Sequence, residues 1–197
     1  LSCEQVKSNP GSDNELGTQV DNQPCSHRKL KAADETGQRL PWTFLVKTVV
    51  EIRETGTQDV ATIAMLVSES NKDVAAKFGL NAENCPKHPS FCTASWVKAD
   101  LARGEVYFVI KEDSNPIGCV AYENPSAGLA YLNRLSVLPQ HRNRGAGTRL
   151  VQHIIQHARS ASIQTISIGL IGEHTTLQRW YNKIGFVDGE TRRFAHL

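Results

Sequence analysis

Residues 140–150, QHRNRGAGTRL, place glycines and basic side chains where a strand-like apolar run meets an amphipathic helix. The first turn of a helix presents unpaired N–H groups and a partial positive charge. Gly145 and Gly147 leave room for a phosphate to approach those donors. Three further side chains can donate hydrogen bonds to phosphate oxygens: Arg142, Arg144 and Thr148. These residue types in this order predict a binding loop for a diphosphate.

The helix after the loop must hold it in place. One apolar stripe runs along this helix, formed by Leu150, Val151, Ile154, Ile155 and Ala158. The helix is therefore expected to dock on a sheet, with its N-terminus at the end of the preceding strand. Two common phosphate-binding patterns do not match, because the GxxxxGK[ST] motif and the third glycine of a dinucleotide fingerprint are absent. A tight strand-to-helix turn with exposed arginines is the alternative for this loop.

Strand-like and helix-like segments alternate from residue 47 onward. Strands are predicted at residues 47–54, 104–113, 116–124, 128–139 and 164–171. Helices are predicted from an N-cap at Thr57, over 71–80 with a stop at Gly79, over 93–104, from the loop to Ser160, and over 173–185. Residues 186–197 are expected to form a strand pair with a turn at Asp188 and Gly189. This order predicts an α/β fold with a mixed, mostly antiparallel central sheet flanked by helices.

The first 46 residues differ from this pattern. They are rich in Ser, Asn, Asp, Gln, Gly and Pro and have hardly any periodic apolar residues. We therefore expect residues 1–46 to be a polar N-terminal extension of unknown role, and residues 47–197 to form one domain.

Composition argues against several classes of protein. The net charge of +2 disfavours binding to nucleic acid or to an anionic membrane by bulk electrostatics. No run approaches the roughly 18 apolar residues that cross a bilayer, and the N-terminus lacks the apolar core of a signal peptide. The five cysteines, an odd number, are scattered and do not resemble a secreted disulfide framework. We expect a cytoplasmic protein.

Cysteine and histidine residues suggest metal binding in three places. These are Cys3, Cys25 and His27; Cys85, His88 and Cys92; and the helical pair His153 and His157. The spacing of the first group matches no common zinc pattern, and the second group lacks a clear fourth ligand and contains two prolines. The helical pair is expected to be solvated. We therefore predict no bound metal, and a metal-binding interaction protein is the least favoured interpretation.

Two landmarks, taken in order, resemble one protein family. Arg142-x-x-Gly145-x-Gly147, after NRLSVLP and before an amphipathic helix, resembles the coenzyme A loop of the GNAT superfamily of acetyl-CoA-dependent N-acetyltransferases. The segment WYNKIGF, residues 180–186, resembles the second landmark of that family, an aromatic residue and tyrosine followed by Gly-Phe. The resemblance covers the chain from about residue 48 to the end and excludes the first 46 residues.

The resemblance implies a GNAT-like sheet and a cosubstrate, acetyl-CoA. It implies that the pyrophosphate is bound by Arg142, Asn143, Arg144, Gly145, Ala146, Gly147 and Thr148. It also implies that backbone groups of Leu135, Ser136 and Val137 pair with the pantetheine arm. One of those N–H groups would polarise the acetyl carbonyl, as an oxyanion donor does.

Tyr181 is the predicted general acid for the leaving thiolate. A phenol has a reference pKa of about 10, above the roughly 8.5 of a thiol, and therefore stays protonated at neutral pH. The alternative is a packed core tyrosine, because Leu177, Trp180, Tyr181 and Ile184 form a plain apolar stripe. The resemblance to the GNAT family favours the role of general acid for Tyr181.

The general base is less clearly marked. Related enzymes often carry a glutamate at the position of Tyr131, so this chain departs from the family pattern. Glu123, at the end of a predicted strand, is the nearest carboxylate and one candidate. His174, where the family tends to have asparagine, is the other, and its alternative is a residue that caps the helix start.

Together these features predict an N-acetyltransferase that transfers the acetyl group of acetyl-CoA to a primary amine by direct attack in a ternary complex. The acceptor is left open between small amines, antibiotics, amino acids and protein amines. The alternative is a non-catalytic acyl-CoA-binding regulatory module of the same fold, which Tyr131 and His174 favour. The sequence does not decide between a monomer and a homodimer.

Overall fold

The computed structural model describes residues 3–10 and 48–193. The chain separates into two units, and the first, residues 1–11 with 49–197, holds every element below. Its strands are β1 Cys3–Pro10, β2 Val50–Glu54, β3 Val106–Glu112, β4 Asn115–Ser126, β5 Leu129–Val137, β6 Thr165–Ile171 and β7 Val187–Arg193. Its helices are α1 Val60–Phe78, α2 Ala94–Ala102, α3 Ala146–Ser160 and α4 Thr175–Lys183, with short 3-10 turns at Thr57–Asp59, Pro89–Phe91 and Pro139–His141.

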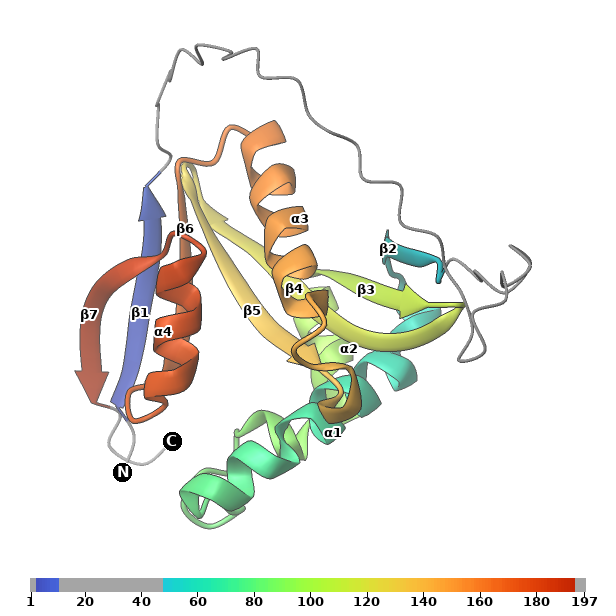
Figure 1. Ribbon diagram of the computed structural model, residues 1–197, viewed down its shortest axis with the longest axis horizontal. Coiled ribbons are helices and arrows are strands. Elements are labelled where there is room, and N and C mark those ends of the chain that lie inside the picture. The colour runs from blue at the N-terminus through green and yellow to red at the C-terminus, as the bar shows by residue number, and fades with distance from the viewer. Residues whose placement is uncertain (1–2, 11–47, 194–197) are drawn as a thin grey trace, which may run out of the picture. The chain divides into compact units, whose positions relative to one another are not determined.

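The strands form one seven-stranded sheet in the order β2-β3-β4-β5-β6-β1-β7 (Figure 1). Every neighbouring pair is antiparallel except β5 and β6, which are parallel. The predicted α/β fold with a mixed, mostly antiparallel sheet and flanking helices is confirmed. No helix of the described residues is long and apolar enough to span a membrane.

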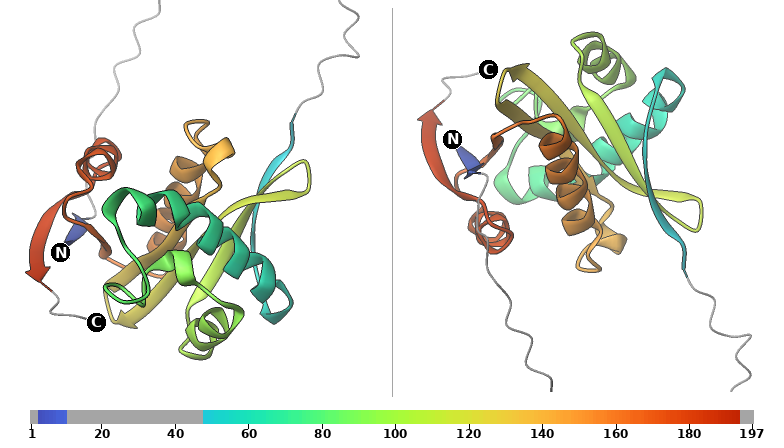
Figure 2. Two further views of the ribbon diagram at one scale, coloured as in Figure 1. Left: turned by 90° about the horizontal axis from the view of Figure 1, so that it is seen from below. Right: turned by 90° about the horizontal axis from the view of Figure 1, so that it is seen from above.

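Helices cover both faces of the sheet. On one face, α3 packs on alternate side chains of β3, β4 and β5, and α4 packs beside β7, in one core that includes Phe108, Val120, Leu150 and Tyr181. On the other face, α1 and α2 pack on the intervening side chains, such as Tyr107 and Cys119. The two views in Figure 2, from opposite sides, show α1 and α2 on one side of these strands and α3 on the other. The stripe predicted for α3 faces this core.

A β-bulge interrupts β5 near its C-terminal end. Cys119 pairs with Ser136 and Ala121 with Asn133, so Arg134 and Leu135 both lie opposite Val120. Arg134 has a φ of 54°, in the left-handed region that residues with a Cβ rarely adopt. Bulges turn strands and re-aim their backbone groups, and they are common next to active sites.

Gly118 of β4 allows the close approach of β5 beside this bulge. A Cβ built on Gly118 would lie 2.6 Å from the carbonyl oxygen of Ser136. Because that oxygen belongs to the backbone, Gly118→Ala is expected to lower the free energy of unfolding by about 1–3 kcal/mol. Urea unfolding measures this change. Gly147→Ala is the matched control, since its Cβ would meet ordinary contacts at 3.5 Å or more; equal stability of the two variants would contradict the prediction.

Two predicted boundaries in the helices were wrong. One continuous helix, α1, replaces the two pieces expected from Thr57 and over 71–80, and Thr57 begins a 3-10 turn while Asp59 is the N-cap of α1. Polar residues in the middle of α1 suggest a break, but the helix continues through them: Lys72 and Asp73 are exposed, while Ser70 is buried. The predicted stop at Gly79 is confirmed, with a φ of 63° at the C-cap.

The two ends of the described chain also differ from prediction. Residues 187–193 form a single strand instead of a strand pair, so Asp188 and Gly189 lie inside β7 rather than in a turn. Residues 3–10, which the sequence assigns to a polar extension, form β1 between β6 and β7. Strand pairing uses backbone groups, so a segment without an apolar alternation can still join a sheet. The rest of the predicted extension, to residue 46, lies outside the described residues.

Candidate active site

The predicted phosphate loop lies where β5 ends and α3 begins. After Val137 the chain makes the 3-10 turn, passes Asn143 at a φ of 60°, and reaches the N-cap Gly145 at a φ of 85°. Because the N-cap is a glycine, no side chain at that position caps this end of α3. Its first-turn N–H groups therefore remain available to a ligand, as the sequence predicts. Arg144 is exposed and Thr148 is half-buried beside these groups.

The two sequence landmarks meet in space at Gly147. A Cβ on this glycine would lie 3.5 Å from Cζ2 of Trp180 and 3.9 Å from Cγ2 of Val137. The end of β5, the start of α3 and the middle of α4 therefore converge at one place. Tyr181, the predicted acid, follows Trp180, and their ring centroids are 4.7 Å apart.

Arg142, predicted to bind the pyrophosphate, is bonded to groups of the protein itself. Its NH1 and NH2 groups bind the carboxylate of Asp73 in α1 at 2.5 and 3.1 Å, and NH2 also donates to the carbonyl of Ser70. Its Nε donates to the carbonyl of Val137 at 3.1 Å. Most of its donors are thus used inside the protein, where Arg142 links the loop to α1 and β5. Its contact with a phosphate stays a prediction.

The Arg142–Asp73 pair predicts a pH-dependent contribution to stability. Hydrogen bonds from Arg142 lower the pKa of the Asp73 carboxyl. The carboxylate therefore stabilises the fold above its unfolded pKa of about 3.9, and this contribution is lost as pH falls through the lower folded pKa. Because the Asp73 side chain is 52% exposed, solvent screens the pair, and Asp73→Asn should cost at most about 1 kcal/mol at pH 7.

Urea unfolding at pH 7, 5 and 3 tests this prediction. The difference between wild type and Asp73→Asn should persist at pH 5 and shrink at pH 3. Glu69→Gln is the matched control on the same helix, since it breaks an exposed ion pair with Lys72 that does not involve the loop. A difference of constant size down to pH 3 would contradict the role of the ion pair.

Among the described strands, none pairs with the end of β5 on the side of β6. The parallel register of β5 with β6 covers only Leu129–Tyr131 against Thr165–Ser167. Beyond these residues the two strands diverge, as Figure 1 shows. The side chain of Ser136 is buried, and its Oγ accepts a hydrogen bond from Asn71 of α1 at 3.3 Å. The predicted pantetheine residues Leu135, Ser136 and Val137 therefore lie just after the bulge, on the strand that separates from β6.

Tyr181 packs in the core, and its hydroxyl stays protonated. It is buried, and its ring meets Phe186 edge-on with centroids 5.4 Å apart. Burial raises the pKa of its hydroxyl above the usual value of 10. Among the described residues, none forms a hydrogen bond with this hydroxyl. The group thus stays protonated across the neutral range and keeps its donor free.

His174 is the N-cap of α4. Its Nδ1 accepts a hydrogen bond from the backbone N–H of Leu177 at 3.3 Å, and its ring lies against Phe78 of α1 with centroids 5.4 Å apart. Burial and the neighbouring Lys77 lower its pKa, so the ring is neutral at pH 7. This is the capping role that the sequence offers as the alternative to a base.

Glu123 lies across the strand pair from Tyr131, the position where related enzymes often have glutamate. Its carboxylate accepts a hydrogen bond from Asn133 Nδ2 at 3.0 Å. Strand alternation from Cys119 and Ala121 puts Glu123 on the face that α1 and α2 cover. Directly opposed residues on one face have Cβ atoms about 5 Å apart, so Glu123 can present a carboxylate beside Tyr131.

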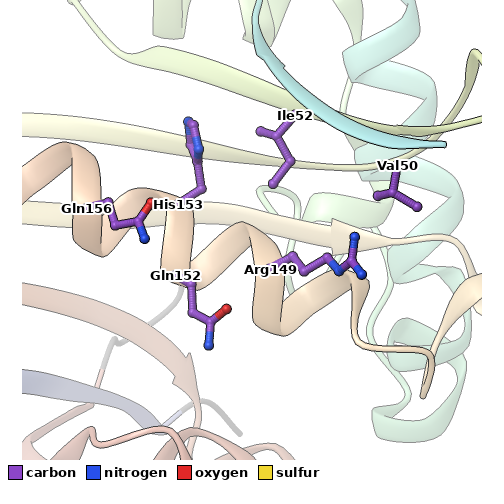
Figure 3. Close-up of a pocket in the computed structure, with 6 residues that line it drawn as sticks. All are labelled: Val50, Ile52, Arg149, Gln152, His153 and Gln156. Atoms are coloured by element: carbon purple, nitrogen blue, oxygen red, sulfur yellow. The ribbon is translucent and has the colours of Figure 1, made fainter.

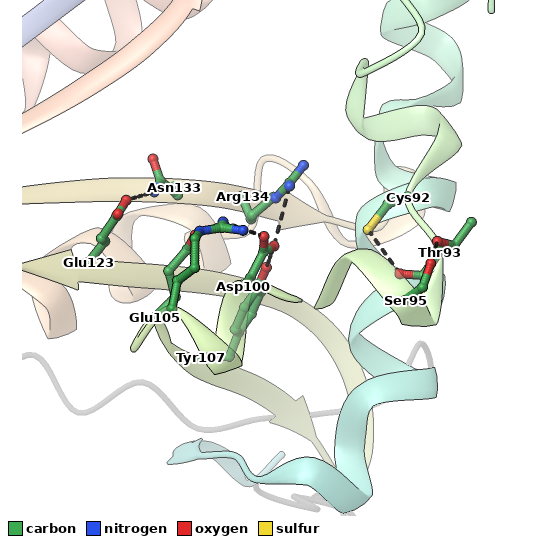
Figure 4. Close-up of polar contacts among 10 residues, drawn as sticks. Cys92, Thr93, Ser95, Asp100, Glu105, Tyr107, Glu123, Asn133 and Arg134 are labelled. Atoms are coloured by element: carbon green, nitrogen blue, oxygen red, sulfur yellow. Dashed lines mark hydrogen bonds and ion pairs between the residues drawn. The ribbon is translucent and has the colours of Figure 1, made fainter. Parts of the chain in front are cut away.

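A buried polar cluster lies on the same face (Figure 4). Asp100 of α2 accepts hydrogen bonds from Tyr107 and Arg103, each at 2.7 Å, and forms an ion pair with Arg134 at 3.3 Å. Arg103 also binds Glu105 at 2.7 Å, while Oε2 of Glu105 is buried without a partner among the described residues. Burial, followed by repulsion from Asp100, raises the pKa of Glu105. The sequence analysis missed this cluster, because no spacing pattern marks a charged residue as buried.

A surface groove of about 430 Å³ lies between β2 and α3, lined by Val50, Ile52, Arg149, Gln152, His153 and Gln156 (Figure 3). It contains none of the predicted site residues. His153 and His157 pack against the rings of Phe108 and Tyr122 rather than forming a solvated pair, and desolvation lowers the pKa of His153. The groove is therefore separate from the site described above.

The segment with Cys85, His88 and Cys92 is a loop stabilised by its own hydrogen bonds. His88 is buried, and its Nδ1 accepts a hydrogen bond from Ser90 N at 3.2 Å at the start of the 3-10 turn. Both cysteines are free thiols. Within residues 3–10 and 48–193, no group of three His, Cys, Asp or Glu side chains is arranged to hold a metal. Cys25 and His27 lie outside the described residues.

The sequence model of the Acetyltransferase (GNAT) family matches residues 73–186, more than half of the chain. This protein therefore belongs to the GNAT acetyltransferase family. The match spans both landmarks, from the end of α1 to the Gly-Phe after α4. Among curated proteins, no sequence matches.

Solved structures of this family share the fold. PaiA N-acetyltransferase from Thermoplasma acidophilum, in complex with coenzyme A, is 19% identical, with 73% of this chain and 93% of that chain covered and a TM-score of 0.60. A GCN5-related N-acetyltransferase from Ralstonia eutropha is 18% identical, covering 76% of this chain and 99% of that chain, with a TM-score of 0.57. An acetyltransferase from Clostridium acetobutylicum, solved with acetyl-CoA, is 16% identical over 76% and 96%, with a TM-score of 0.53.

Proposed function

We propose that this protein transfers an acetyl group from acetyl-CoA to a primary amine, by direct attack of the amine on the thioester in a ternary complex. The observation that carries the proposal is the convergence of the loop, the end of β5 and α4 at Gly147. A pyrophosphate at the N-terminus of α3 would start a pantetheine arm that runs along β5 toward the bulge.

The coenzyme would be held by backbone and side-chain donors of the loop. The N–H groups of the first turn of α3, from Ala146 onward, point at the pyrophosphate, and Arg144 and Thr148 add side-chain donors. Arg142 also supports the loop, because its bonds to Asp73 and Val137 fix the loop against α1 and β5. Where β6 no longer pairs with β5, the amides of the pantetheine arm form hydrogen bonds with backbone groups of Leu135, Ser136 and Val137.

The chemistry then needs a polarised carbonyl, a neutral amine and a protonated leaving group. An N–H group of the bulge, at or next to Leu135, donates to the acetyl oxygen as negative charge develops there. Glu123, acting through water, takes a proton from the amine, whose nitrogen then forms the bond to the acetyl carbon. As the carbon–sulfur bond breaks, Tyr181 donates its proton to the coenzyme A thiolate, and the nitrogen, which is positively charged after the attack, gives its surplus proton back to the tyrosinate.

Release of free thiol from acetyl-CoA in the presence of a panel of amines tests the proposal. Turnover that requires both acetyl-CoA and an amine supports it. Binding of acetyl-CoA without turnover of any amine would instead favour a non-catalytic acyl-CoA-binding module. Tyr131 in place of the usual glutamate, and the use of His174 as a helix cap, favour that second candidate.

A further inference from the structure

Arg134, the residue at the bulge of β5, is a half-buried cation with spare donors. Its side chain is only 20% exposed. Its guanidinium lies over the Trp96 ring at 5.7 Å from the centroid, within the range of a cation–π contact. A guanidinium has five N–H donors in a fixed planar arrangement and no acceptor. Yet the Arg134 side chain donates no well-aligned hydrogen bond to any residue in the described part of the chain.

Asp100 forms an ion pair with Arg134 but no hydrogen bond, although its carboxylate can accept more than the two hydrogen bonds that Arg103 and Tyr107 donate. One oxygen accepts from Arg103 and the other from Tyr107, each at 2.7 Å, while the nearest Arg134 nitrogen is 3.3 Å away. Asp100 therefore holds Arg134 in place as an ion pair without a well-aligned hydrogen bond. Figure 4 shows part of the guanidinium pointing away from Asp100.

The position of Arg134 relates it to the acceptor rather than to the coenzyme. It directly precedes Leu135, whose region is proposed to polarise the acetyl carbonyl, and it extends over the face of α1 and α2. Glu123, the proposed base, lies on the same face and is held by Asn133, the residue before Arg134. The carboxylate of Glu123, the proposed base for the amine, and the guanidinium of Arg134 therefore lie next to the same part of β5.

We propose that Arg134 binds a carboxylate of the acceptor, and that the acceptor is an amino acid or another small amine that carries a carboxylate. This inference rests on the proposed function. The planar guanidinium of Arg134 can bind a carboxylate through two parallel hydrogen bonds. This geometry requires a guanidinium of fixed orientation, and the ion pair with Asp100 fixes it. The ammonium end of the same molecule would then lie toward Glu123.

Matched pairs of amines test the inference, with the full chain and acetyl-CoA. The panel contains the common amino acids and their carboxamides, and thiol release gives kcat and KM for each. The wild type should prefer acids. Arg134→Gln should lower kcat/KM for acids by at least about 30-fold, mainly through KM, because a buried charge pair is lost. For the amides it should change little, and comparing variant with wild type for each amine cancels differences in amine basicity.

Two further variants separate binding from structural support. Arg134→Lys keeps the charge without the planar fork and should give an intermediate, still acid-selective loss; it replaces Arg134→Gln if that variant does not fold. Arg103→Gln removes the other guanidinium bound to Asp100 and should affect acids and amides alike. Each variant should retain the thermal shift with acetyl-CoA.

Three results would overturn the inference. An equal loss for acids and amides in Arg134→Gln would make Arg134 a support for the bulge only. A wild type that binds acetyl-CoA but shows no preference for acids, or acetylates none of them, would rule out carboxylate recognition. A wild type that does not bind acetyl-CoA would overturn the proposed function itself, which distinguishes that failure from the other two.

Discussion

We expect acetyl-CoA to stabilise this protein and Gly147→Glu to abolish that stabilisation. At 100 times its dissociation constant, a ligand stabilises a protein by about 2.7 kcal/mol, or about 5–10 °C for a domain of this size. In the variant, the new side chain would enter the space between Trp180, Val137 and the first turn of α3. It would fill the place of the pyrophosphate and bring negative charge to donors that must bind an anion. Thermal midpoints with and without acetyl-CoA measure the effect.

The control for this variant is Gly147→Ala. Its Cβ would lie 3.5 Å from Trp180, an ordinary van der Waals distance, so the alanine variant should fold and keep most of the thermal shift. The pair therefore separates occlusion of the site from simple loss of a glycine. A full shift in a folded Gly147→Glu variant would place the coenzyme elsewhere.

Local patterns in the sequence were sufficient for the loop and the helix that supports it. The glycine spacing and the stripe that includes Leu150 and Ile154 depend on residues within one or two helical turns, and the structure places both as predicted. The stop at Gly79 is of the same kind, because a left-handed C-cap strongly favours glycine. Such features are readable because neighbouring residues determine them.

Other parts of the site depend on contacts between distant residues. Arg142 resembles a phosphate ligand in sequence, and its neighbours do not reveal its bonds to Asp73, which lies 69 positions away. Asp100 of α2 meets Arg134 of β5 only in the folded chain, and the bulge at Arg134 is a feature of the pairing between β4 and β5. A one-residue bulge has no recognisable pattern in the sequence of an apolar strand. NRLSVLP therefore predicts a strand but does not show that its arginine, Arg134, lies at a bulge.

Tyr181→Phe is expected to lower kcat by about 100-fold while leaving the affinity for acetyl-CoA unchanged. Burial raises the pKa of the Tyr181 hydroxyl, so the group remains protonated at every pH at which a thiolate of pKa about 8.5 must be neutralised. The phenylalanine fills the same space in the core. Because no hydrogen bond of the hydroxyl to a described residue is lost, stability should change little. Steady-state thiol release and a thermal shift with acetyl-CoA measure the two quantities.

Tyr122→Phe is the matched control for Tyr181→Phe. Both tyrosines belong to the core cluster under α3 and α4, and the Tyr122 hydroxyl is buried with no partner among the described residues. Removing that hydroxyl should leave kcat unchanged and should not destabilise the fold, since an unsatisfied buried polar group is costly. If both variants lose activity equally, Tyr181 acts through packing. If only Tyr181→Phe loses kcat while acetyl-CoA still binds, the hydroxyl supplies the proton and the non-catalytic alternative is excluded.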